Sequence, residues 1–106
     1  ESFLENSLVN FLRMDAKLIY RMFKALPSPI QRPYFKFKNN FFVISSCKMA
    51  EGEFRGQPGR VVGNFEGGVV VICKSGSIIL NILIKKNSEK EYAAKIFLKS
   101  GDLIHD

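Results

Sequence analysis

The order of apolar and polar residues predicts one helix followed by a series of short strands. Residues 16 to 26 place apolar side chains at helical spacing, and Asp15 directly before them can accept the free amides of the first turn. Pro27 and Pro29 should end this helix, because proline lacks an amide hydrogen and disfavours helix in the residue before it. From residue 34 onward the helical spacing gives way to the alternation typical of strands.

Five segments after the prolines are predicted strands, at residues 34–38, 41–49, 59–63, 69–74 and 77–84. Most connections between them are short and contain Gly, Asn or Ser, which adopt the backbone conformations of tight turns. Asn39 and Asn40 are the expected turn between the first two strands, and the longer loop at 51–58 contains Gly52, Gly56 and Pro58. Such a series of strands predicts a closed or nearly closed barrel.

A second helix is expected near the end of the chain. Ser88 and Glu91 match a capping box, in which each side chain binds the other residue's backbone amide. Apolar residues follow at helical spacing as far as Lys99, and Gly101 suits the left-handed position that ends a helix. The predicted fold is therefore mainly β with two helices (α+β), one before and one after the strands. Residues 1–33 form the first helix and a Pro-rich connector, residues 34–106 form the barrel with the last helix, and together they make one domain.

Length and composition indicate one globular domain. The 106 residues are 46% apolar and include ten Phe, which supplies enough apolar surface for a core. The apolar runs are far shorter than the roughly 20 residues of a membrane span, so we expect no membrane partner. Cys47 and Cys73 lack the spacing of a zinc or redox motif, and they are either buried thiols of a cytosolic protein or a disulfide between neighbouring strands. The start at Glu1 suits a fragment of a larger protein.

Positive charge is concentrated in one quarter of the chain. The net charge is +6, and residues 13–38 alone carry seven Lys or Arg residues against Asp15. Such a segment attracts polyanions because phosphate neutralisation releases condensed counterions. The alternative is a solvated face that only keeps the domain in solution.

Motifs of catalysis or metal binding are absent from the sequence. There is no P-loop, no dinucleotide fingerprint, no nucleophile elbow and no cluster of metal ligands. His105 is the only histidine, and it lies so close to the chain end that we expect a solvated residue rather than a catalytic base. We therefore assign no catalytic residue and no metal ligand.

Three segments resemble the C-terminal domain of the folate-dependent formyltransferases, the family of methionyl-tRNA formyltransferase and the sugar N-formyltransferases. They are Pro58 to Val62, Glu66 to Cys73 and Ala93 to Asp102. The chain departs from the family pattern around Gln31 to Phe35, where a Gly-Ala pair is missing. The resemblance implies a small five-stranded OB-like barrel that belongs to a cytoplasmic enzyme. That enzyme's catalytic centre would lie in a separate N-terminal domain, with 10-formyltetrahydrofolate as the formyl donor.

By this resemblance the chain is a non-catalytic accessory domain that helps to position the formyl acceptor beside its own N-terminal catalytic domain. The acceptor would be tRNA or a nucleotide sugar. The candidate phosphate-binding residues are Lys17, Arg21, Lys24, Arg32, Lys36 and Lys38. Two alternatives are a subunit-packing domain that forms a homodimer, as in sugar formyltransferases, and an unrelated OB-like module that binds nucleic acid. Because most Phe residues occupy core positions, contact with the backbone of a folded RNA is favoured over base stacking.

Overall fold

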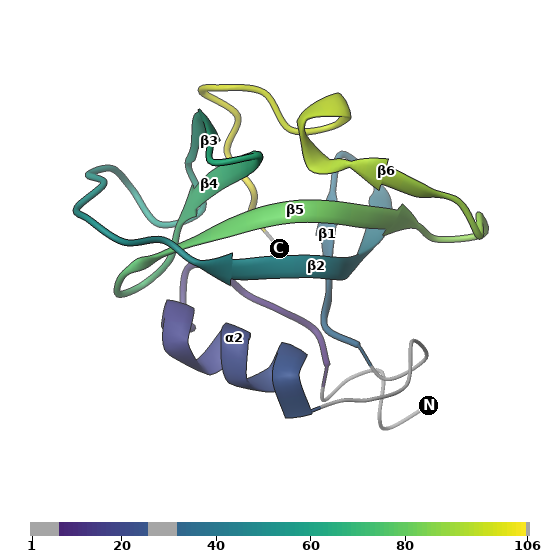
Figure 1. Cartoon of the computed structure of the whole chain (residues 1–106), viewed down its shortest axis with the longest axis horizontal. Coiled ribbons are helices and arrows are strands. Elements are labelled where there is room, and N and C mark those ends of the chain that lie inside the picture. The colour runs from purple at the N-terminus through teal and green to yellow at the C-terminus, as the bar shows by residue number, and fades with distance from the viewer. Residues whose placement is uncertain (1–6, 26–31, 106) are drawn as a thin grey trace.

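The computed structural model describes residues 7–25 and 32–105. In these residues one α-helix, α2 (Ala16–Ala25), precedes an antiparallel sheet, and a short 3-10 helix at Ala94–Ile96 follows its last strand (Figure 1). The strands are β1 (Tyr34–Phe37), β2 (Asn40–Met49), β3 (Val61–Phe65), β4 (Gly68–Ile72), β5 (Ser77–Lys85) and β6 (Glu91–Ala93). The five strands expected from the sequence are all present, and β6 is an addition.

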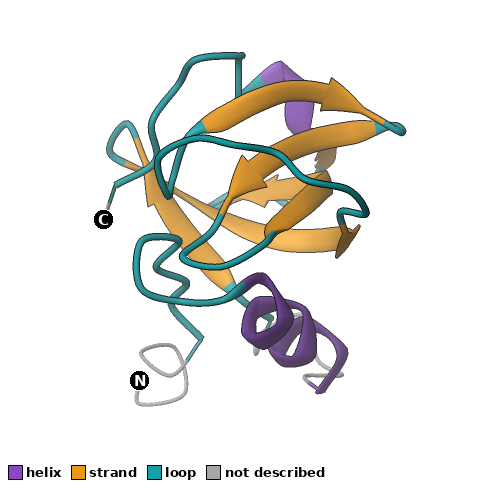
Figure 2. Cartoon of the chain, turned by 90° about the vertical axis from the view of Figure 1, so that its left-hand side faces the viewer, coloured by secondary structure: helices purple, strands orange, loops and turns teal. Residues whose placement is uncertain are grey.

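Helix α2 lies against one side of the sheet, where it contacts β2 and β5 (Figure 2). Ala16 and Ile19 are its buried residues, and Met22 and Phe23 pack partly buried against the core. Leu18 departs from the expected apolar stripe, because it is 42% exposed. Asp15 does not act as a side-chain cap. The Ala16 amide instead donates to the Ser75 carbonyl at 2.9 Å, because the turn between β4 and β5 reaches the start of the helix. The predicted end of the helix at Pro27 and Pro29 lies outside the described residues.

The sheet has the strand order β1-β2-β5-β4-β3, and β6 pairs with β5 outside this path. The β1–β2 turn lies one residue earlier than expected, since Lys38 and Asn39 have the positive φ angles of 49° and 65°. The register of β2 on β5 shifts around Ser45, between Ile44 and Ser46. Such a bulge bends and twists a strand, and β2 curls with the rest of the sheet.

The core fills the space enclosed by the curled sheet and α2. Every residue of β4 is buried, as is the first half of β5. Segments outside the strands also contribute to the core, with Phe11 packing edge-to-face on Phe35 at a ring-centroid distance of 5.4 Å. Gly68 is required where it stands, because a Cβ atom there would collide with Ile79 and with the Leu80 carbonyl.

The prediction of a second α-helix after Ser88 is wrong, because the first residues of that segment form β6 instead. β4 covers only Ser77 to Leu80 of β5, so the far half of β5 has a free edge, and Glu91–Ala93 pairs with Ile82 to Ile84 along that edge. The Ser88 hydroxyl accepts the Lys90 amide at 3.2 Å in a local turn, so the capping box does not form. Long-range pairing of the backbone therefore overrides the local helical pattern.

We expected a closed or nearly closed barrel, and the described residues form an open, curled sheet, because no strand pairing joins β1 to β3. Other segments occupy these two ends. The Val61 amide donates to the Asp102 carbonyl at 2.8 Å, and the Ile104 amide donates to the Gly59 carbonyl at 2.8 Å. At the opposite end Leu8 forms an isolated parallel bridge with Tyr34. The described residues contain no helix that is long and apolar enough to cross a membrane.

Candidate functional site

The six predicted phosphate-binding residues fall on two different elements and a connector. Lys17, Arg21 and Lys24 are exposed on α2, and we call them the helix group. Lys36 and Lys38 are exposed on β1 and at its end. The helix packs on β2 and β5 rather than on β1, so the candidates do not form one continuous row. Along the chain Arg32 lies between these two sets, and its side chain is half-buried.

The helix group is an exposed cationic face. Lys17 and Arg21 are four residues apart and therefore neighbours on the helix surface. The Lys24 ammonium lies 5.9 Å from the centre of the Tyr20 ring, which holds it by a cation-π contact. None of the three forms an ion pair with any described residue, since the two ion pairs found there join Lys48 to Glu66 and Arg55 to Glu53. The charges of the helix group are thus available to an anionic partner.

Arg32 has a structural role that its sequence context did not reveal. Its guanidinium Nη1 donates to the Ser45 carbonyl at 2.9 Å and to the Ser45 hydroxyl at 3.3 Å. The guanidinium also lies 5.7 Å from the centre of the Phe23 ring. Ser45 stands at the bulge of β2, where the register gives it no partner on β5, so Arg32 satisfies its carbonyl.

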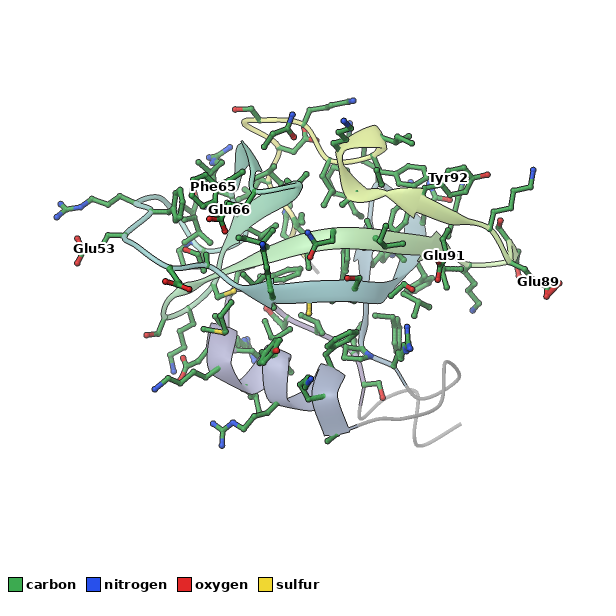
Figure 3. All side chains as sticks on the ribbon, viewed as in Figure 1. Glu53, Phe65, Glu66, Glu89, Glu91 and Tyr92 are labelled. Carbon is green, nitrogen blue, oxygen red and sulfur yellow. The ribbon has the colours of Figure 1, made fainter. Side chains whose placement is uncertain are left out.

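The same hydrogen bonds continue to β6. The Ser45 hydroxyl donates to Glu91 Oε2 at 2.8 Å, and Glu91 reaches from β6 across β5 to make this contact (Figure 3). We call Arg32, Ser45 and Glu91 the Arg32 clip. It joins the segment before β1 to β2 and β6. Arg32 is therefore less suited to phosphate contact than the exposed lysines, because part of its donor set is already used.

Lys86, which the sequence analysis did not select, lies beside the β1–β2 hairpin. Lys36 pairs with Phe41 across the hairpin, and the Lys86 amide donates to the Phe41 carbonyl at 2.8 Å. The ammonium groups of Lys36 and Lys86 lie 6.0 and 5.2 Å from the centre of the Phe41 ring. Their clustering depends on the pairing of three strands, and no spacing along the chain indicates it.

Both cysteines are buried thiols without a disulfide. Burial raises the pKa of Cys47 to about 12. Burial, with a smaller effect of the Asp15 charge, likewise raises the pKa of Cys73 to about 12. Because the thiolate is the reactive form, neither cysteine is set up as a nucleophile at neutral pH. The described residues also contain no group of three His, Cys, Asp or Glu side chains placed to hold a metal ion.

The described residues form a small β-rich domain with exposed cations on α2 and on the β1–β2 hairpin. Residues 3–101 match the model of the formyl transferase C-terminal domain. The chain belongs to this family.

Solved structures of another protein share this fold. HypX from Aquifex aeolicus in complex with tetrahydrofolic acid superposes with a TM-score of 0.76 and 17% sequence identity, over 93% of this chain and 18% of that chain. A variant of the same protein with four substitutions gives a TM-score of 0.74 and 20% identity, over 93% of this chain and 19% of that chain. This chain thus spans less than a fifth of either HypX chain, and the likeness shows a shared fold. No curated protein matches the sequence.

Proposed function

We propose that this chain is the accessory domain of a formyltransferase and helps to hold the formyl acceptor near an active site in a separate N-terminal domain. Membership of the formyl transferase C-terminal domain family supports this role. The proposed donor of the whole enzyme is 10-formyltetrahydrofolate, and the tetrahydrofolic acid complex of the similar HypX structure supports that choice. We also propose a cytoplasmic location, which suits the two free, buried cysteines.

The observation that carries the proposal is the set of exposed cations without ion-pair partners among the described residues. Lys17, Arg21 and Lys24 on the helix, with Lys36 and Lys38 on the hairpin, keep their charge available to the phosphates of a polyanion. We therefore propose tRNA as the acceptor. The domain would supply contacts to the RNA backbone, and such contacts give affinity that falls as salt rises.

A salt titration tests the role of the helix group. We expect the variant with Lys17→Glu, Arg21→Glu and Lys24→Glu to bind tRNA more weakly and to have a flatter dependence of log affinity on log salt. The slope should fall by about one unit for each phosphate that the variant no longer neutralises. A control carries Lys95→Glu and Lys99→Glu, because both lysines are exposed and line a hollow beside β3, an element on which α2 does not pack. Its slope is compared with that of the helix variant per charge reversed. Equal slopes for the helix variant and the unmodified chain would exclude the helix group as an RNA contact.

A second proposal concerns the partner that packs on the domain. Leu12 and Leu18 are 40% and 42% exposed, and they lie just before and within α2. Exposed large apolar side chains that gather in one part of a chain are typical of protein contacts. We propose that they contact the enzyme's own catalytic domain or a second subunit. Sedimentation of the chain at increasing concentration would show a dimer in the second case.

A further inference from the structure

Two adjacent hollows lie where β1 meets the C-terminal segment, and both are lined by Lys36. The cationic hollow measures about 330 Å³, and its polar lining comes from Lys36, Lys38, Asn39, Asp102 and His105. The apolar hollow measures about 240 Å³ and is lined mainly by Leu8, Phe11, Phe41 and Ile104, with Lys36 at its border. Neither hollow is marked by any local sequence motif, because each combines β1 with residues that are distant from it along the chain.

The cationic hollow carries more positive than negative charge. Lys36 and Lys38 face a single acidic residue, Asp102, whose Oδ2 already accepts the Lys99 amide at 2.8 Å. Lys38 also lies 5.2 Å from the centre of the Phe37 ring, so its ammonium stays at the hollow. His105 is exposed, as expected from the sequence, but its side chain lines this hollow beside the two lysines. Several donors from two separate segments therefore surround one space suited to an anion.

The apolar hollow differs from the cationic one in its lining, which is mainly apolar. Phe41 is half-buried on the hairpin, and Leu8 is 39% exposed beside it. Two ammonium groups, of Lys36 and Lys86, lie near the Phe41 ring. A planar, electron-rich ring placed here would contact apolar surface and cations together, which is how nucleobases are held on protein surfaces.

We propose that the two hollows form one binding site for a nucleoside monophosphate unit. The phosphate lies in the cationic hollow between Lys36, Lys38 and His105, and the base lies in the apolar hollow against Phe41 and Leu8. Lys36, which lines both, contacts the phosphate where it joins the sugar. The combined space is within the range of small-molecule sites. For its biological role this inference rests on the proposed acceptor-holding function, because RNA and nucleotide sugars both carry this unit.

The first experiment is an NMR titration of the full 106-residue chain with adenosine 5′-monophosphate, with adenosine and with inorganic phosphate. We expect the nucleotide to shift the amides of Lys36, Lys38, Phe41 and Ile104 together. Adenosine and phosphate alone should bind at least about tenfold more weakly, because each fills only one hollow. Nucleotide shifts scattered over the surface, or none at these four amides, would overturn the proposal.

Three variants test the named contacts. Lys36→Gln removes the charge that lines both hollows, and we expect about a tenfold loss of nucleotide affinity. His105→Gln should lower the affinity for the nucleotide and for phosphate but not for adenosine. Phe41→Leu should lower the affinity for the nucleotide and for adenosine but not for phosphate. The matched control is Lys95→Gln, since Lys95 lines a hollow of similar size, about 330 Å³, beside β3. A loss as large in the control as in Lys36→Gln would mean that net charge alone governs binding, and the site would be rejected.

A last comparison separates the two sources of the ligand. A single-stranded RNA trinucleotide and UDP-glucose are titrated separately. If both shift the same four amides, the one that binds with higher affinity shows whether RNA or a nucleotide sugar is the source of the ligand. Failure of the site and failure of the proposed function give different results. Nucleotide binding without salt-dependent tRNA binding supports the site and removes the tRNA role. Binding of tRNA through the helix group, with no response to any nucleotide, supports the role and overturns the site.

Discussion

Arg32 shows how the role of a residue depends on what its side chain contacts. In the sequence it is one of seven cations in a basic segment, and it is equivalent to its neighbours. In the structure its guanidinium satisfies the Ser45 carbonyl at the β2 bulge, and the Ser45 hydroxyl in turn binds Glu91. The exposed ammonium groups of Lys36 and Lys38 form no ion pair with any described residue, so they remain candidates for a ligand. A half-buried arginine with a carbonyl partner stabilises the fold.

We therefore expect Arg32→Ala to lower the free energy of unfolding by about 1–2 kcal/mol, because the Ser45 carbonyl loses its charged donor. Lys17→Ala is the control, since its side chain is exposed on α2, and its effect should be small. Urea unfolding followed by circular dichroism measures both. An Arg32→Ala domain that is as stable as the unmodified chain, but binds tRNA less well, would show that Arg32 is a ligand rather than a clip.

At the scale of elements, segments outside the main strands complete the sheet. β6 pairs with the free edge of β5, and the chain from Gly101 to Ile104 follows β3. Gly59 is required for this approach, because it has a φ of 92° and a Cβ atom there would collide with the Ile104 carbonyl. Both pairings satisfy backbone groups that would otherwise face solvent at an edge.

Removal of residues 102–106 should destabilise the domain by about 3–5 kcal/mol. The Val61 amide would lose the Asp102 carbonyl, the Gly59 carbonyl would lose the Ile104 amide, and the core would lose the buried Ile104 side chain. Removal of residues 105–106 alone should have little effect, because His105 is exposed. Thermal melting of both truncated chains provides the measurement. Equal melting temperatures would show that the C-terminal segment does not stabilise the sheet.

At the scale of the whole molecule, the N-terminal segment is part of the core. Val9, Phe11, Ala16 and Ile19 are all buried and belong to the same apolar cluster as the residues of β2, β4 and β5. A domain of this size has little stability to spare, so loss of one side of its core has a large effect. That residues 1–33 and 34–106 form one domain remains a prediction, which the following experiment tests.

A chain of residues 34–106 should accordingly fail to fold cooperatively on its own. It would expose the face of Phe35 on which Phe11 packs, and the buried side chains of Val9, Phe11 and Ile19 would leave the core at once. The spread of amide signals in a nitrogen-proton NMR spectrum tests this directly. A well-dispersed spectrum with a sharp melting transition would show that residues 34–106 are a complete domain.

The sequence by itself determined the helix at 16–25 and the five main strands, because alternation and helical spacing are local properties that the same local backbone then satisfies. It also determined the family, through segments that are continuous along the chain. Tertiary structure decided where β6 forms, how the sheet ends are covered, and which cations meet. Lys36 and Lys86 come together because three strands pair side by side, and His105 lies near Lys36 because the chain end returns to β1. Contacts between distant segments depend on the packing of the whole core, and no local pattern encodes them.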